Sequence, residues 1–129
     1  MPYTDNDHVL SDEQAVTATA VSTNVVDLGA DGNSDGRQMR LIVDCTEAAT
    51  AAGAATVTFS FETDDNTAFS SATTLASTAA IGKAALTAAS RVWELTLPKT
   101  VERYVRVNYT VATGPLTAGK FKAYLAREA

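Results

Sequence analysis

The sequence predicts an all-β fold, an antiparallel jelly roll or β-sandwich of about eight strands in a single domain. Three observations favour this prediction. Apolar and polar residues alternate with a period of two in several short segments, as in half-buried strands. Segments rich in turn-forming residues separate them. The length of 129 residues suits one domain. We assign residues 13–129 to this domain and residues 1–12 to a flexible N-terminal arm.

The expected strands differ in the strength of their pattern. In chain order they are residues 15–20, 25–28, 39–45, 57–61, 73–77, 93–97, 105–111 and 121–125. Four of them, including 57–61, alternate strictly and predict half-buried strands. Residues 39–45 form a more continuous apolar run, which indicates a strand buried on both faces. The weakest patterns are residues 15–20, 25–28 and 73–77.

Turn-forming residues mark the breaks between these segments. Residues 29–36 (GADGNSDG) predict a long polar loop, residues 63–66 (TDDN) a turn, and Gly114-Pro115 a hairpin loop. Two alanine-rich stretches, residues 47–55 and 79–90, are ambiguous, because alanine favours helix. A short helix in either stretch would leave the fold class unchanged.

Composition and charge exclude several classes of function. The net charge is −5 without a cluster of Lys and Arg, so the chain is poorly suited to nucleic acid, whose phosphates require cations. No apolar run approaches the ~20 residues that cross a bilayer, so we expect no membrane partner. The first residues lack a basic and an apolar region, so we expect no signal peptide. A single cysteine, Cys45, forms no internal disulfide, which is consistent with synthesis in a cytoplasm.

The apolar content predicts a thin core. The hydrophobic fraction is 46%, but much of it is alanine, and the large aromatic residues are 4 Tyr, 4 Phe and 1 Trp. Burying alanine removes little apolar surface from water. We therefore expect an isolated monomer of modest stability that gains stability on assembly.

The sharpest local motif is a partial calcium loop. Asp31, Asn33 and Asp35 follow the pattern D-x-N-x-D-G, in which oxygens at alternate positions converge on one ion. The twelfth position is Ile42, where a calcium loop has a bidentate glutamate, and the flanks predict strands instead of helices. A solvated turn accounts for the same residues, so we predict no bound metal and keep calcium as the alternative.

The other reactive residue types lack the surroundings that catalysis needs. His8, the single histidine, falls in the predicted arm, without a recognisable nucleophile or carboxylate partner. Cys45 falls in an apolar strand, where cysteine behaves as a small hydrophobic residue. Asp64-Asp65-Asn66 could offer oxygens to a metal, but a tight polar turn explains it better. We predict that the chain is not an enzyme and carries no cofactor.

A few large side chains are candidates for a protein interface. Tyr104 and Tyr124 fall on the polar faces of their predicted strands, Arg106 follows Tyr104 on the same strand, and Tyr3 lies in the predicted arm. Aromatic residues and arginine are enriched at interfaces. The alternative is that each tyrosine covers a neighbouring strand of its own sheet.

Three segments carry a resemblance to a known family. Residues 9–29 (VLSDEQAVTATAVSTNVVDLG), 46–77 (TEAATAAGAATVTFSFETDDNTAFSSATTLAS) and 102–125 (ERYVRVNYTVATGPLTAGKFKAYL) together make up more than half of the chain. In this order they resemble the capsid cement (decoration) proteins of short-tailed bacteriophages of the Bordetella-phage type. The most specific stretches are TDDN-x-AFSS and RYVRVNYTVATGP-x-TAGK. The first eight residues, the DGNSDG loop and residues 79–99 depart from the family pattern.

The resemblance implies a structural role in a virion. Members of the family are jelly-roll proteins that dimerise and clamp neighbouring major capsid protein subunits on the outer surface of the head. We therefore expect the major capsid protein and a second copy as partners, and a place on the outer capsid after synthesis in the host cytoplasm. Two alternatives remain open, another virion β-domain, such as a head-fibre base or a tail component, and a calcium- or sugar-binding β-sandwich module.

Overall fold

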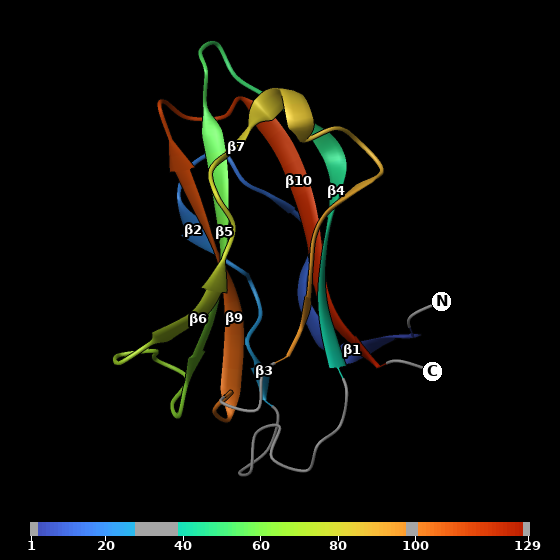
Figure 1. The fold of residues 1–129 in the computed structure, drawn as a ribbon, viewed down its shortest axis with the longest axis vertical. Coiled ribbons are helices and arrows are strands. Elements are labelled where there is room, and N and C mark those ends of the chain that lie inside the picture. The colour runs from blue at the N-terminus through green and yellow to red at the C-terminus, as the bar shows by residue number, and fades with distance from the viewer. Residues whose placement is uncertain (1–2, 28–38, 98–100, 128–129) are drawn as a thin grey trace.

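Two antiparallel β-sheets pack face to face in the computed structural model (Figure 1). It describes residues 3–27, 39–97 and 101–127, and only the backbone of residues 3–8, 39 and 127. The strands are β1 (Tyr3–Ala15), β2 (Ala20–Val21), β3 (Val26–Asp27), β4 (Met39–Thr50), β5 (Thr56–Asp64), β6 (Thr73–Ser77), β7 (Ile81–Gly82), β8 (Ser90–Thr96), β9 (Tyr104–Ala112) and β10 (Ala118–Arg127). One 3-10 helix, η1 (Lys83–Ala85), precedes β8. No helix of the described residues is long and apolar enough to cross a membrane.

The strand order is that of a jelly roll. Sheet A has the order β1-β10-β4-β8, and sheet B has the order β2-β9-β5-β6, with β3 paired to β9 and β7 paired to β5. The short pairs β2 with β3 and β6 with β7 each act as one interrupted strand, which leaves eight. Numbered in this way along the chain, sheet A contains strands one, eight, three and six, and sheet B contains strands two, seven, four and five. This is the order of a double Greek key. The predicted all-β fold is confirmed, and the long-range pairing decides between the sandwich and jelly-roll alternatives.

The period of two predicted the inner faces of the sheets correctly. On β9, Val105, Val107 and Tyr109 are buried, while Arg106 and Asn108 between them are half-buried on the outer side. Because a strand points successive side chains to opposite faces, the apolar set meets the opposing sheet.

Three aromatic side chains join the sheets at the centre of the core. Phe59 of β5 and Tyr109 of β9 come from sheet B, and Phe121 of β10 comes from sheet A. Phe59 meets Tyr109 and Phe121 edge to face, with ring centroids 5.7 and 5.3 Å apart, and Tyr109 stacks on Phe121 at 5.7 Å. Such geometry contributes beyond the burial of area alone.

A buried hydrogen bond also joins the sheets. The Tyr109 hydroxyl donates to Ser11 Oγ at 2.8 Å, and Ser11 Oγ donates to Gln14 Oε1 at 2.6 Å. Burial raises the pKa of Tyr109 to about 12, and the bond to Ser11 lowers it by a smaller amount. The phenol is therefore held in its neutral form between β9 of sheet B and β1 of sheet A.

The N-terminal region differs from the sequence prediction. Residues 3–12, assigned above to an arm, lie within β1, which pairs antiparallel with β10 from Tyr3 opposite Arg127 to Ala15 opposite Lys120. The segment is polar and lacks an alternating pattern, so its own sequence does not indicate a strand. Its backbone groups find partners on β10, and Leu10 is fully buried in the core.

The weakest segments had mixed outcomes. Residues 73–77 form β6 as predicted, and β3 covers the middle of residues 25–28. Residues 15–20 were predicted as one strand, but β1 ends at Ala15, residues 17–19 form bends, and the two-residue β2 begins at Ala20, so this prediction was wrong. The two alanine-rich stretches have different structures. The first begins as the end of β4, which continues to Thr50, and the second contains the short helix η1.

Candidate interaction surfaces

The outer face of sheet B carries the two large hydrophobic side chains that are exposed in the described part of the chain. They are Val21 at 40% and Val25 at 38% exposure. Val21 pairs with Asn108, which points outward because Val107 and Tyr109 point inward. Val25 precedes Val26, whose side chain is buried in the core, so Val25 also points outward.

Tyr104 and Arg106 of β9 lie on this same face, because they alternate with buried Val105 and Val107. We call the surface formed by Val21, Val25, Tyr104, Arg106 and Asn108 the β9 face. The sequence analysis named Tyr104 and Arg106, and the structure brings them together with the two valines.

The charge of Arg106 is neutralised within the β9 face. Arg106 Nε contacts Glu62 Oε1 of β5 at 2.7 Å, and Asn108 donates to the second Glu62 oxygen at 3.4 Å. The Arg106 guanidinium also covers the ring of buried Phe69, 4.3 Å from its centroid. These contacts hold the arginine between Glu62 of β5 and Phe69 of the loop that follows β5.

The charges beside Tyr104 are paired in the same way. Arg103 donates to both oxygens of Asp27, with Nε and an amino group at 2.9 and 3.0 Å. The aspartate raises the pKa of Arg103, and the guanidinium lies 5.1 Å from the centre of the Tyr104 ring. The β9 face therefore combines apolar, amide and hydroxyl groups with internally paired charges.

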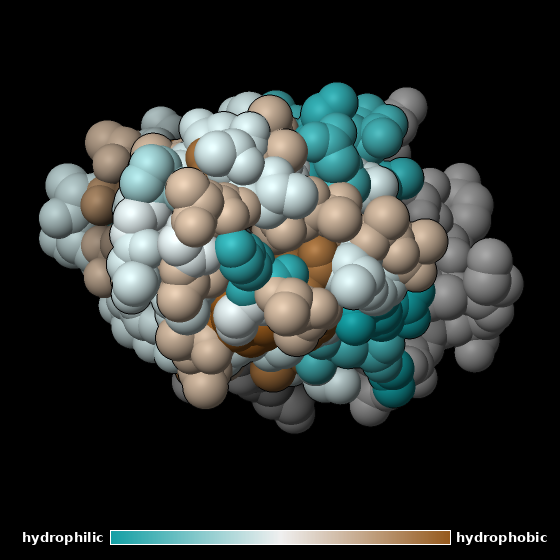
Figure 2. Space-filling view, turned by 90° about the horizontal axis from the view of Figure 1, so that it is seen from above, coloured by the Kyte–Doolittle hydropathy of each residue, from teal (hydrophilic) through white to brown (hydrophobic). Residues whose placement is uncertain are grey.

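The outer face of sheet A carries a network of ion pairs between side chains. Arg40 of β4 pairs with Glu94 of β8, and Arg91 pairs with Asp44 at 3.2 Å and with Glu94 at 3.1 Å. Figure 2 looks down on the upper end of the sandwich. Most of the strongly hydrophilic side chains lie toward the β4 and β10 side, whereas the β5 and β9 side is pale. The two outer faces thus differ in chemical character.

Tyr124 lies on this second face and is not exposed. It is 7% exposed and packs with Ile42, Ala126 and half-buried Val9. Burial and the Asp44 carboxylate raise the pKa of Tyr124. The sequence analysis expected an exposed tyrosine because Tyr124 shares its strand face with Lys120 and Lys122. Ile42 and Val9, from distant parts of the chain, cover it, so the expected exposure was wrong.

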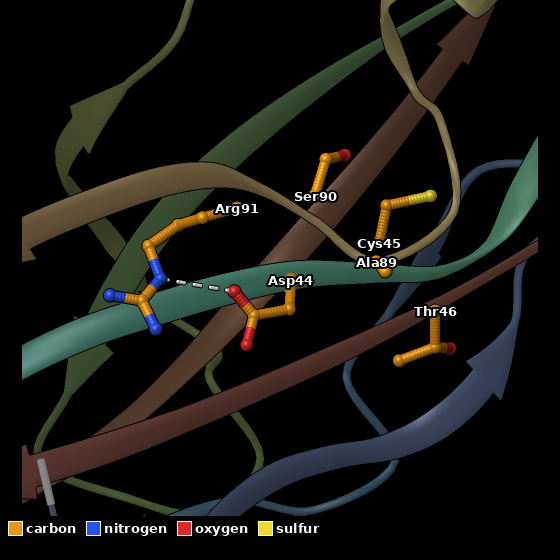
Figure 3. Close-up of a pocket in the computed structure, with 6 residues that line it drawn as sticks. All are labelled: Asp44, Cys45, Thr46, Ala89, Ser90 and Arg91. Atoms are coloured by element: carbon orange, nitrogen blue, oxygen red, sulfur yellow. Dashed lines mark hydrogen bonds and ion pairs between the residues drawn. The ribbon is translucent and has the colours of Figure 1, made fainter. Parts of the chain in front are cut away.

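A shallow pocket opens at the edge of sheet A (Figure 3). It measures about 390 Å³ and is lined by Asp44, Cys45, Thr46, Ala89, Ser90 and Arg91. Figure 3 shows the Arg91 guanidinium reaching the Asp44 carboxylate, with the Cys45 sulfur directed away from both. Cys45 is buried, as predicted, and burial raises the pKa of its thiol, which keeps it protonated and unreactive at neutral pH.

The acidic turn after β5 is built by backbone hydrogen bonds. Carboxylate oxygens of Asp64, Asp65 and Glu102 lie within 4.8 Å of one another. Asp64 already accepts the amide of Asp65 at 2.6 Å and the amide of Ser71 at 2.9 Å, and the Ser71 bond is the main cause of its lowered pKa. The geometry supports the predicted turn, in which Asp64 ties the two ends of the loop together.

Other candidate residues fall outside the description. The calcium candidates Asp31, Asn33 and Asp35 lie outside the described residues, and so do the side chains of Tyr3 and His8, whose backbones belong to β1. The sequence analysis missed Val21 and Val25. Their signal was two valines without an alternating pattern in a segment of Ser, Thr and Asn.

The family model described as Bbp16 matches residues 10–125, a span that begins in β1 and ends in β10. A search of curated proteins found no match.

Proposed function

The chain belongs to the Bbp16 family, a family of phage proteins, and from this premise we propose that it is a capsid cement protein. In this proposal the protein binds the outer surface of a phage head and clamps neighbouring subunits of the major capsid protein. The observation that carries the proposal is the family match over residues 10–125, which spans the jelly roll from within β1 to within β10. The resemblance of residues 9–29, 46–77 and 102–125 to cement proteins supports the finer role.

The β9 face is the surface best suited to contact a capsid subunit. The centres of protein interfaces are depleted in unpaired charge and enriched in aromatic side chains and arginine. On the β9 face, Tyr104 and Arg106 lie beside exposed Val21 and Val25, and Glu62 neutralises the arginine. Covering this face removes apolar surface from water without stripping water from an unpaired charge.

The ion network on sheet A is less suited to the same role. Arg40, Arg91, Asp44 and Glu94 would each lose hydration on docking, and desolvation offsets much of the attraction between charges. We therefore assign the ionic face to the solvent side of the bound protein and the β9 face to the shell.

The proposed role follows from simple binding thermodynamics. A protein that binds two adjacent subunits stabilises the assembled shell, because it binds the assembled state and not the separated one. Many copies on one shell make weak individual contacts sufficient. In the proposal the protein acts as a homodimer, which offers two equivalent docking surfaces across a two-fold axis.

Electron cryomicroscopy of virions that contain the protein tests the location. We expect jelly-roll density on the outside of the head, at positions that follow the capsid symmetry. Density confined to the tail or to a head fibre would contradict the cement role and favour the other virion β-domain. The orientation of the density also tests the assignment of faces, because the β9 face should point toward the shell.

A further inference from the structure

Arg106 differs from Arg91 and Arg103 in how many of its hydrogen-bond donors are already used. Arg91 and Arg103 each donate from two guanidinium nitrogens to carboxylates of the same chain. Arg106 donates only from Nε, to Glu62 at 2.7 Å. Within the part of the chain that the structure describes, neither amino group of Arg106 has an acceptor at hydrogen-bond distance. Most of the N–H donors of this guanidinium therefore remain available.

The Arg106 guanidinium is also held in one place. Its side chain is 21% exposed, and that of Glu62 is 12% exposed. The second oxygen of Glu62 accepts a hydrogen bond from Asn108, and the Phe69 ring lies against the guanidinium, with its centroid 4.3 Å from the central carbon. Because folding has already ordered this arginine, a partner that binds it does not have to fix a free side chain.

The loop after β5 is shaped to keep Phe69 at this position. Phe69 is buried and has a φ of +50°, a left-handed conformation that costs free energy in a residue other than glycine. Its amide donates to the Asn66 carbonyl at 3.3 Å, and the Ser71 amide donates to Asp64 at 2.9 Å. Hydrogen bonds within the loop thus stabilise the conformation that places the ring against Arg106.

Docking of the β9 face has a consequence for the amino groups of Arg106. Covering this face removes the water that hydrates them. A buried donor without an acceptor costs more free energy than a typical hydrogen bond contributes. The surface that covers the β9 face must therefore place acceptors opposite Arg106, and a surface without them is rejected.

The charges around Arg106 favour a neutral acceptor over a carboxylate. Glu62 already neutralises the arginine, and the whole chain carries a net charge of −5. Asp64 adds a negative charge close by, since it pairs across the sheet with Tyr104, two residues before Arg106. A partner carboxylate would meet repulsion without an unpaired positive charge to offset it. A main-chain carbonyl carries no charge, and loops and the C-terminal ends of helices present such oxygens without internal partners.

We propose that Arg106 is the specificity-determining residue of the β9 face, and that its two amino groups donate to main-chain carbonyl oxygens of a major capsid protein subunit. The donors of a planar guanidinium lie in one plane, which suits two neighbouring acceptors. This inference rests on the proposed cement role. It adds the group that recognises the shell and the chemistry that this group recognises.

The substitution Arg106→Lys tests the inference in co-sedimentation with mature shells that lack the protein. Lysine keeps the positive charge beside Glu62 but loses the planar pair of amino groups. We expect binding about tenfold weaker, as for the loss of one or two hydrogen bonds. The matched control is Arg91→Lys, the same change on the ionic face of sheet A, which should bind like the native protein. Thermal unfolding of each variant reports whether it is folded.

The outcomes separate the inference from the cement role. Equal binding of Arg106→Lys and the native protein would overturn the inference and leave the cement role standing. Equal weakening of Arg106→Lys and Arg91→Lys would also overturn it, because the effect would then not depend on the β9 face. A native protein that does not bind shells would contradict the cement role and the inference together.

A second measurement needs no variant and covers the case in which Arg106→Lys does not fold. It is a near-atomic reconstruction of shells decorated with the native protein. We expect main-chain carbonyl oxygens of a capsid subunit at about 2.9 Å from the amino nitrogens of Arg106. A carboxylate at this place, or Arg106 still in contact with solvent, would overturn the inference while the bound protein still supports the cement role.

Discussion

The buried Tyr109 hydroxyl predicts a distinctive loss of stability at alkaline pH. Its pKa is about 12 in the folded protein, against about 10 in an unfolded chain. Below pH ~10 the phenol is protonated in both the folded and the unfolded state, and it makes its full contribution to the free energy of unfolding. Between pH ~10 and ~12 the unfolded chain ionises while the folded protein does not, so stability falls as pH rises. The shift of about two units corresponds to a loss of about 2.7 kcal/mol.

The substitution Tyr109→Phe isolates this contribution. At neutral pH the variant loses the hydrogen bond to Ser11, which costs about 1 kcal/mol, and it keeps the ring packed against Phe59 and Phe121. The variant cannot ionise at this position, so it lacks the alkaline loss. We therefore expect the native protein to be more stable at pH 7 and the variant to be more stable near pH 12.

Denaturant unfolding of both proteins at one protein concentration, over a series of pH values from 7 to 12, measures the difference. Tyr124 and the other titrating groups are common to both chains, so they cancel in the comparison. Parallel pH dependence of the two free energies of unfolding would refute the argument. It would mean that the Tyr109 hydroxyl is not held neutral by burial between the sheets.

Further predictions concern the turn, the core and the calcium loop. Asp64→Asn should lower the thermal midpoint at neutral pH. The difference from the native protein should vanish as pH falls through the lowered pKa of Asp64, because the native carboxylate then loses its charge. A difference in thermal midpoint that does not depend on pH would contradict the role of the carboxylate. Phe121→Ala should cost about 3–5 kcal/mol in urea unfolding, because it empties the centre of the core, and a loss below about 1 kcal/mol would contradict that placement. Millimolar calcium should leave the thermal midpoint unchanged if the segment with Asp31 is a solvated turn, and a clear rise would favour the calcium alternative.

The sequence predicted elements whose information is local. Residues 73–77 were predicted to the residue, and the alternation at Val105, Val107 and Tyr109 predicted the buried face of β9. The jelly-roll order depends on pairings between distant segments, such as β1 with β10, which no local pattern encodes. For the same reason the polar segment of residues 3–12 was assigned to an arm.

The candidate surface was predicted in part. Tyr104 and Arg106 share the β9 face because they lie two residues apart on one strand, which the sequence shows. Tyr124 was misjudged because Ile42 and Val9 cover it from other strands. The exposure of Val21 and Val25 depends on the short β2 and β3 pairing with β9, and a lone valine in a polar segment does not reveal its direction.

Co-sedimentation with mature capsid shells that lack the protein tests the cement role most directly. Native protein should bind saturably, with a copy number tied to shell symmetry. The variant V21E/V25E should bind at least about tenfold more weakly. Each valine is about 40% exposed, and burying this exposed surface against the shell contributes ~0.8 kcal/mol to the binding free energy. The control T87E/T96E, with the same added charge on exposed positions away from the β9 face, should bind like the native protein. Equal binding of all three proteins would contradict the docking face, and no binding of the native protein would contradict the cement role itself.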